Sequence, residues 1–86
     1  MKQIFKYELE PQSVTTLHVP NTFKVLSCGA IDGNLFVWIE TFPSHKMTPV
    51  DFHVVATGET FDHNLTFLGT TLMNTNELVV WHIYYE

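Results

Sequence analysis

The amino-acid sequence predicts an all-β protein, a small antiparallel sandwich or partly open barrel of about seven short strands. Short segments alternate between apolar and polar residues, as half-buried strands do. Turn-forming Gly, Pro, Asn and Asp residues separate these segments at short intervals. No apolar pattern keeps helical spacing beyond one turn. A chain of 86 residues can bury a modest core, so we expect a single antiparallel β domain over residues 1–86.

The first two predicted strands cover residues 4–9 and 14–19. In the first strand Lys6 and Glu8 alternate with apolar neighbours, as expected for a strand with one face in the core. The segment 10–13 between the strands contains a proline, which fixes φ and restricts the residue before it. We therefore expect a turn there, and a second break after residue 19.

The strongest local signal in the chain is a predicted hairpin over residues 23–40. Asp32-Gly33 lies between two apolar runs, and Asp-Gly favours a two-residue type I′ turn. Both central residues of that turn need positive φ, which glycine adopts freely and aspartate tolerates. The sequence therefore predicts two antiparallel strands that meet at this turn.

The same turn predicts the register of the hairpin. It places Cys28 opposite Val37 and Leu26 opposite Ile39. One face of the hairpin then has small and aliphatic side chains, and the other is a mixed face that includes Trp38. Because neither face is polar, we expect the whole hairpin to lie in the middle of a sheet.

The second half of the chain predicts three further strands. Residues 41–49 contain two prolines and are expected to be irregular. Strands are predicted at 50–57, 65–73 and 77–85, with a turn rich in asparagine between the last two. Gly69 interrupts the second of these strands and predicts a β-bulge or a close backbone approach.

Composition narrows the classes of partner. The formal net charge is −5, the basic residues are four lysines, and there is no arginine. Direct nucleic-acid binding is therefore disfavoured, since it depends on clustered Lys and Arg.

Cys28 is the single cysteine, so no internal disulfide is expected. The N-terminus does not resemble a signal peptide, and no apolar run is long enough to cross a bilayer. We expect a soluble intracellular protein without a membrane association.

Catalytic and metal-binding patterns are not found in the sequence. The five histidines lack the spacings of metal sites and are interpreted as scattered surface or core residues: His18, His45, His53, His63 and His82. Cys28 lies on the predicted core face, where a thiol behaves as a small hydrophobe rather than a nucleophile. We expect no catalytic residue, no metal site, no cofactor and no enzymatic activity.

Two further kinds of polar group admit a functional alternative. Glu40, Asp51 and Glu59 fall near strand ends and could act as paired acids, although solvated carboxylates are also common there. Gly58 and Gly69 each stand beside threonine and could present N–H groups to an anion, although turns and bulges use the same residues. The structural interpretation is favoured in both cases.

Surplus aromatic side chains are the best candidates for a binding site. Trp and Tyr are favoured anchors at protein interfaces. The candidate binding residues exceed what one face of a small core needs: Trp38, Phe42, Trp81, Tyr84 and Tyr85. The alternative is that most of these side chains pack inside the protein.

Four stretches in order resemble a family of small uncharacterised proteins encoded by bacteriophages and prophages. They are I-F-K-Y-E-L-E at 4–10, K-V-L-S-C-G-A-I-D-G-N-L-F-V-W at 24–38, F-H-V-V-A-T-G at 52–58, and F-L-G-T at 67–70 followed by L-V-V-W-H-I at 78–83. The resemblance covers nearly the whole chain. It implies a phage accessory protein in the cytoplasm of the host cell, and it brings no known active site.

The function expected on this basis is stoichiometric binding to a host protein or protein complex, as an inhibitor of a bacterial anti-phage defence system. The alternatives are a sponge for a signalling nucleotide, or a minor virion or assembly component. The last predicted strand is apolar on both faces. A homodimer could cover the second face, with Trp81, Tyr84 and Tyr85 as anchors, and the segment 41–49 is the competing cover.

Overall fold

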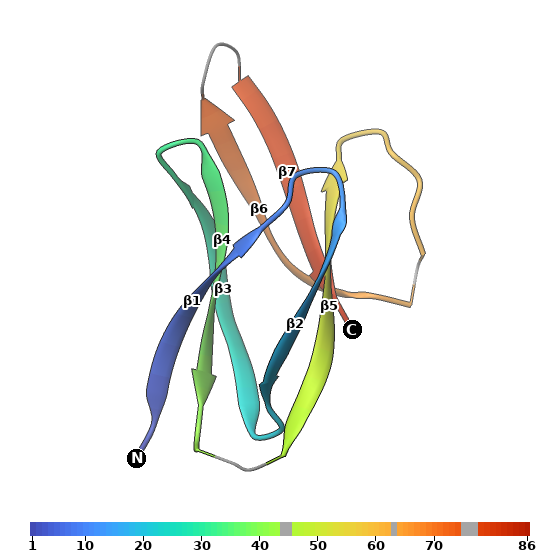
Figure 1. The fold of residues 1–86 in the computed structure, drawn as a ribbon. Helices are drawn as coiled ribbons and strands as arrows, with labels where there is room; N and C mark the ends of the chain where they lie inside the picture. The colour runs from blue at the N-terminus through green and yellow to red at the C-terminus, as the bar shows by residue number, and fades with distance from the viewer. Residues whose placement is uncertain (44–45, 63, 75–77) are drawn as a thin grey trace.

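The structure is a computed structural model that describes residues 1–43, 46–62, 64–74 and 78–86. Seven strands run through these residues, none of which is helical (Figure 1). The strands are β1 (Gln3–Leu9), β2 (Val14–Pro20), β3 (Phe23–Ile31), β4 (Asn34–Thr41), β5 (Met47–Ala56), β6 (Thr66–Asn74) and β7 (Leu78–Tyr85).

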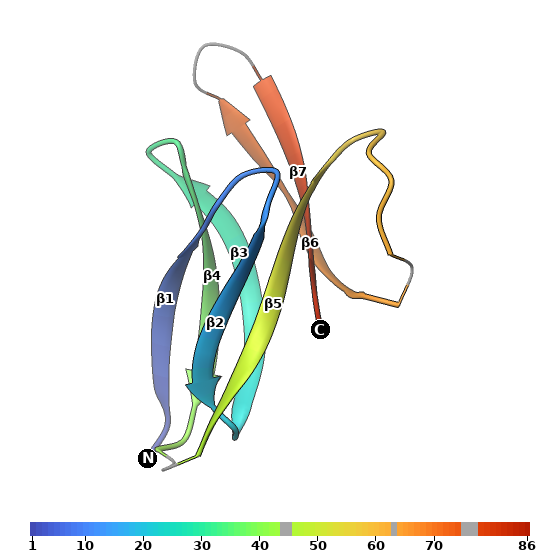
Figure 2. The ribbon, with the colours of Figure 1, turned by 45° about the vertical axis from the view of Figure 1, so that its right-hand side comes forward.

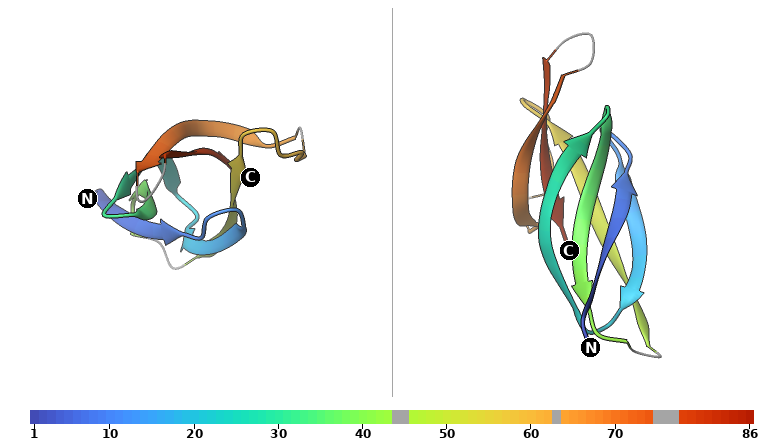
Figure 3. Two further views of the ribbon diagram at one scale, coloured as in Figure 1. Left: turned by 90° about the horizontal axis from the view of Figure 1, so that it is seen from above. Right: turned by 90° about the vertical axis from the view of Figure 1, so that its left-hand side faces the viewer.

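The strands form two antiparallel sheets with the orders β1-β4-β3 and β2-β5-β7-β6. β1 and β2 belong to different sheets, and the turn at Gln12, where φ is 54°, joins the two layers (Figure 2). Viewed from above, the strands surround a common interior (Figure 3). The Cα atoms span 42 × 29 × 15 Å, and the shortest dimension suits two sheets packed about 10 Å apart. The predicted all-β fold is confirmed as a sandwich, and the sheets do not close into a barrel.

The inner faces of both sheets supply one hydrophobic core. In β4, Leu35, Val37 and Ile39 are buried, whereas the side chains between them are only half-buried. Phe52 of β5 and Ile83 of β7 are fully buried against them from the other sheet. Burying one such side chain contributes roughly 1.5–3 kcal/mol, so the period-two alternation is the main source of stability here.

The predicted turn between β3 and β4 is confirmed. Asp32 and Gly33 both have positive φ, 50° and 81°, as a type I′ turn requires. Ile31 lies opposite Asn34, and Cys28 lies opposite Val37, as predicted.

A β-bulge changes the predicted register in the first half of β3. The register shifts between Val25 and Ser27, so Leu26 is the extra residue, and Val25 lies opposite Ile39. Because one added residue reverses the alternation, Val25 and Phe23 pack on the core while Leu26 is exposed. The predicted pairing of Leu26 with Ile39 is wrong, since the alternation of apolar residues does not reveal an extra residue.

The hairpin does not lie wholly within a sheet. β4 is the central strand, whereas β3 is an edge strand of its three-stranded sheet. The free side of β3 lies beside β6 of the other sheet. At this seam Cys28 is so close to the β6 backbone that a Cβ atom added at Gly69 would be 3.0 Å from its Sγ atom. The apolar character of β3 therefore serves the packing of one sheet against the other.

β5 begins earlier than the sequence predicts. The prediction of an irregular segment over 41–49 is wrong at both ends. Thr41 is the last residue of β4, and β5 starts at Met47 and includes Pro49, which lies opposite His18 of β2. On its other side β5 is paired only from Asp51 onward, where Asp51 and Glu86 exchange backbone hydrogen bonds and β7 continues the pairing. A proline is tolerated where a strand has a neighbour on one side only, because its missing N–H then breaks no ladder.

The bulge predicted near Gly69 is confirmed one residue earlier. The register of β6 against β7 shifts between Phe67 and Gly69, so Leu68 is the extra residue. Of the predicted turn at 74–76, Asn74 ends β6, and the other two residues lie outside the described residues. The first residue of the last predicted strand, Glu77, also lies outside them.

Candidate functional site

The outer face of the four-stranded sheet has an aromatic cluster formed by Phe61, Phe67 and Tyr84. The Tyr84 ring of β7 lies between the other two, with centroid distances of 4.6 Å to Phe61 and 5.2 Å to Phe67. Phe61 and Phe67 remain 46% and 53% exposed. Aromatic rings held against one another in this way offer a pre-ordered contact surface at little entropic cost.

Further apolar side chains lie along β6 and β7 beyond the polar pair Thr70 and His82, which follows this cluster on the same face. Leu72 lies opposite Val80, and Asn74 lies opposite Leu78, on the same face as Phe67 and Tyr84. Leu72 and Leu78 are 62% and 63% exposed. The aromatic cluster with Leu72, Val80 and Leu78 is called the outer apolar surface below.

His82 lies in the middle of the outer apolar surface and is hydrogen-bonded to Thr57 and Thr70. Its Nε2 atom is 2.8 Å from the Thr57 hydroxyl, and its Nδ1 atom is 2.9 Å from the Thr70 hydroxyl. A neutral imidazole donates through one nitrogen and accepts through the other, so both nitrogens are paired. The arrangement explains His82 as a structural residue that links the start of the 57–65 loop to β6.

The 57–65 loop positions Phe61 over β7 through a tight turn. Gly58 has a φ of 90°, which favours glycine. The Glu59 N–H donates to the Ala56 carbonyl at 3.1 Å, and the Ala56 N–H donates to Glu59 Oε1 at 2.9 Å. Further along, the Asn64 N–H donates to Asp62 Oδ1 at 2.9 Å. Two carboxylates thus fix the loop on either side of Phe61.

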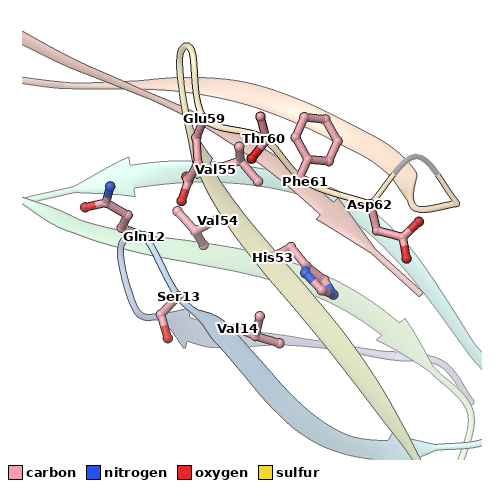
Figure 4. A pocket seen from close by; sticks show the side chains of 10 residues that line it. All are labelled: Gln12, Ser13, Val14, His53, Val54, Val55, Glu59, Thr60, Phe61 and Asp62. Atoms are coloured by element: carbon pink, nitrogen blue, oxygen red, sulfur yellow. The ribbon is translucent and has the colours of Figure 1, made fainter.

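A pocket of about 260 Å³ adjoins the aromatic cluster, with Phe61 in its wall. Figure 4 shows residues 59–62 along one side, residues 12–14 along the other, and residues 53–55 of β5 between them. The Val54 N–H donates to the Ser13 carbonyl at 3.0 Å, which ties the β1–β2 turn to β5. At the edge of the pocket, His53 Nε2 is 3.1 Å from Glu86 Oε2.

Two of the predicted binding residues face the interior. Trp81 is only 9% exposed and is part of the core, and its Nε1–H has no hydrogen-bond partner among the described residues. Tyr85 is half-buried and stacks on Phe52 at 5.7 Å. Trp81 is therefore not an exposed anchor, because alternation along β7 places it on the same side as Ile83.

Trp38 and Phe42 belong to the other sheet. Trp38 is half-buried and 6.4 Å from Phe36, whose ring lies 4.6 Å from Lys6 Nζ. Phe42 is exposed at the end of β4, with Lys2 Nζ 5.6 Å from its ring. The structure therefore brings only Tyr84 of the predicted residues into the outer apolar surface. Phe61 and Phe67 were not among the predicted residues. The only signal for Phe61 is an aromatic residue among polar neighbours, and Phe67 lies in an ordinary strand pattern that gives no such signal.

Cys28 is half-buried and packs against the core at the seam between the sheets. Burial raises the pKa of its thiol, which disfavours the reactive thiolate. No three His, Cys, Asp or Glu side chains in the described part of the chain are grouped to bind a metal ion. Of the five histidines, His45 and His63 lie outside the described residues. Within those residues there is also no helix long and apolar enough to cross a membrane.

Fold and site together define a small two-sheet β protein with an apolar surface on the outside of one sheet. The chain belongs to the family described as a domain of unknown function, DUF7352, whose family model matches residues 1–86. No curated protein and no solved structure matches the chain.

Proposed function

We propose that this protein acts by stoichiometric binding to another protein through its outer apolar surface. The observation behind this proposal is that Phe61, Phe67, Leu72 and Leu78 are all exposed on one face of one sheet. Contiguous exposed apolar side chains on a small protein mark interaction sites. Tyr84, packed between two phenylalanines, is the natural centre of the contact, because interface anchors are usually buried aromatic residues.

The partner proposed is a host protein, on the resemblance to phage-encoded proteins. Inhibition of a defence complex would follow if the bound protein occupied a surface that the complex needs. Such a mechanism needs no catalytic residue and no cofactor. It would take place in the cytoplasm of the host cell.

The pocket beside the aromatic cluster is not suited to the phosphate groups of a signalling nucleotide. Its lining includes the carboxylates of Glu59 and Asp62 and no lysine. A phosphate group there would meet two like charges, and the one basic side chain in the lining, His53, lies 3.1 Å from Glu86 Oε2, so binding is unfavourable. A minor virion component could use the same outer apolar surface, and its presence in purified particles would distinguish it.

Capture of a partner from host lysate tests the proposal when it is done with matched variants. The double variant Phe67→Ser with Leu72→Ser removes apolar area from the outer apolar surface. The control, Ile4→Ser with Ile31→Ser, changes two exposed side chains of the other sheet. All four residues are exposed, so both variants should melt within a few degrees of the natural protein.

We expect the first variant to lose at least about tenfold in partner affinity and the control to lose little. Equal capture by both variants would show that the partner binds elsewhere. Failure of the natural protein to capture any partner at a fixed molar ratio would refute the proposed function.

A further inference from the structure

The whole net charge of the protein lies in the second half of the sequence. Residues 1–46 contain four lysines and four carboxylate residues, which balance. Residues 47–86 contain five carboxylate residues and no lysine. β5, β6, β7 and the 57–65 loop all come from this half, so an anionic region surrounds the outer apolar surface.

The pocket beside the aromatic cluster lies in this anionic half and combines two kinds of wall. Val14, Val55 and Phe61 supply apolar surface, and the loop supplies the carboxylates of Glu59 and Asp62 (Figure 4). Its volume of about 260 Å³ is below the roughly 300–1,000 Å³ typical of sites for whole small molecules. The volume suits a single long side chain better.

The two carboxylates are already oriented by the backbone. Glu59 Oε1 accepts from the Ala56 N–H, and Asp62 Oδ1 accepts from the Asn64 N–H, both at 2.9 Å. A carboxylate has two oxygens and several acceptor positions, so each side chain can still accept a hydrogen bond from a ligand. Little ordering is then needed when a cation arrives, which favours binding.

We infer that the pocket binds the side chain of a lysine or arginine from the partner protein. The aliphatic part of that side chain packs on Val55 and Phe61, and its cationic group is attracted by the carboxylates of Glu59 and Asp62, which lie at opposite ends of the 59–62 segment. Lys and Arg side chains bind in this divided manner, with the stem on apolar surface and the charge at a polar rim. The inference rests on the proposed function and specifies the segment of the partner that makes the contact. In that segment a lysine or arginine stands next to an apolar residue, and the apolar residue reaches the aromatic cluster.

A short blocked peptide, acetyl-Leu-Arg-Leu-amide, is the probe for this inference, with ¹⁵N-labelled full-length protein observed by NMR. We expect saturable shifts at millimolar peptide that are confined to residues 12–14, 53–55 and 59–62 and to Phe67 and Tyr84 of the adjoining aromatic cluster. Raised salt should weaken the shifts, because the contact is partly electrostatic. The matched peptide with Glu in place of Arg should give none.

Conservative variants separate charge from structure. Glu59→Gln with Asp62→Asn keeps the acceptors for the Ala56 and Asn64 N–H groups but removes both charges, and should weaken arginine-peptide binding about fivefold. The control, Glu8→Gln with Asp32→Asn, makes the same change in net charge at two exposed residues of the first half and should leave binding within about twofold.

An equal loss of peptide affinity in both double variants would show that only the net charge of the protein matters, and would overturn the inference. Shifts outside the pocket and the aromatic cluster, or no saturable shift at all, would also overturn it. If a lysine of a second copy occupied the pocket, residues 12–14, 53–55 and 59–62 would shift with protein concentration in the absence of peptide. That result would contradict binding of a partner protein in the pocket. If a captured partner is lost by Phe67→Ser with Leu72→Ser but retained by Glu59→Gln with Asp62→Asn, the proposed function stands and this inference fails.

Discussion

Cys28 of β3 lies against the backbone of Gly69 in β6, and a Cβ atom added at Gly69 would be only 3.0 Å from the Cys28 Sγ atom. The two residues belong to different sheets, so this contact forms part of the seam between them. Gly69 does not have positive φ and is needed for space rather than for its backbone conformation.

Gly69→Ala should therefore destabilise the protein by about 1–2 kcal/mol, because the new methyl group overpacks the seam. In a Cys28→Ala background the sulfur is absent, and the same substitution should be neutral or slightly stabilising, since Ala restricts the unfolded chain. Urea unfolding of the four proteins in this double-mutant cycle measures the coupling. Additive effects would show that the seam has room for both groups.

Cys28 should react slowly with a thiol reagent in the folded protein. Burial raises the pKa of the thiol and limits access to it, so unfolded protein should react far faster. The protonated thiol therefore contributes to the free energy of unfolding. This contribution is fully present below the pKa that the thiol has in the unfolded protein, and it is lost as the pH rises through the pKa that the thiol has in the folded protein.

The melting temperature of the natural protein should accordingly fall more steeply than that of Cys28→Ala between about pH 8 and about pH 10. The variant lacks the thiol but keeps every other titrating group, so it isolates this effect. Equal reaction rates for folded and unfolded protein would place the thiol at the surface.

Gly33→Val should destabilise the protein by about 1–3 kcal/mol. Gly33 has a φ of 81°, which a β-branched residue strongly disfavours. Asp32→Asn in the same turn is the control and should be close to neutral, because asparagine tolerates the φ of 50° at that position. Thermal melts of both variants check the prediction, and an unchanged melting temperature in Gly33→Val would contradict the turn.

Self-association through the outer face of β7 remains a prediction. The structure shows the 57–65 loop covering part of that face through Phe61 on Tyr84, whereas Phe42 and Met47 of the segment 41–49 are exposed. Leu78 at the uncovered end is 63% exposed. We expect light scattering at tens of micromolar to give twice the chain mass of 9.9 kDa. A monomer mass would contradict this prediction, whereas a dimer would have to dissociate before a partner could bind the same surface.

Leu78→Glu should return such a dimer to a monomer without lowering the melting temperature by more than a few degrees, because an exposed leucine contributes little to folding. Ile4→Glu on the opposite sheet is the control and should remain dimeric.

The sequence by itself determined the local features of this protein. Alternation with period two predicts the strands, since successive side chains point to opposite faces. Asp32-Gly33 predicts the turn, because the turn needs positive φ at two adjacent positions, and this depends on the local preferences of the two residues that occupy them. The spacing of these signals was sufficient for the all-β fold class.

Only the tertiary structure decided which faces are buried and which residues meet. The bulges at Leu26 and Leu68 depend on packing against neighbouring strands, and each reverses the alternation beyond it. The approach of Phe61 to Tyr84 joins residues 23 positions apart. Such contacts follow from the relative placement of strands and loops, which the local preferences of the residues do not specify. The pocket likewise exists only because residues 12–14, 53–55 and 59–62 come together in the folded chain.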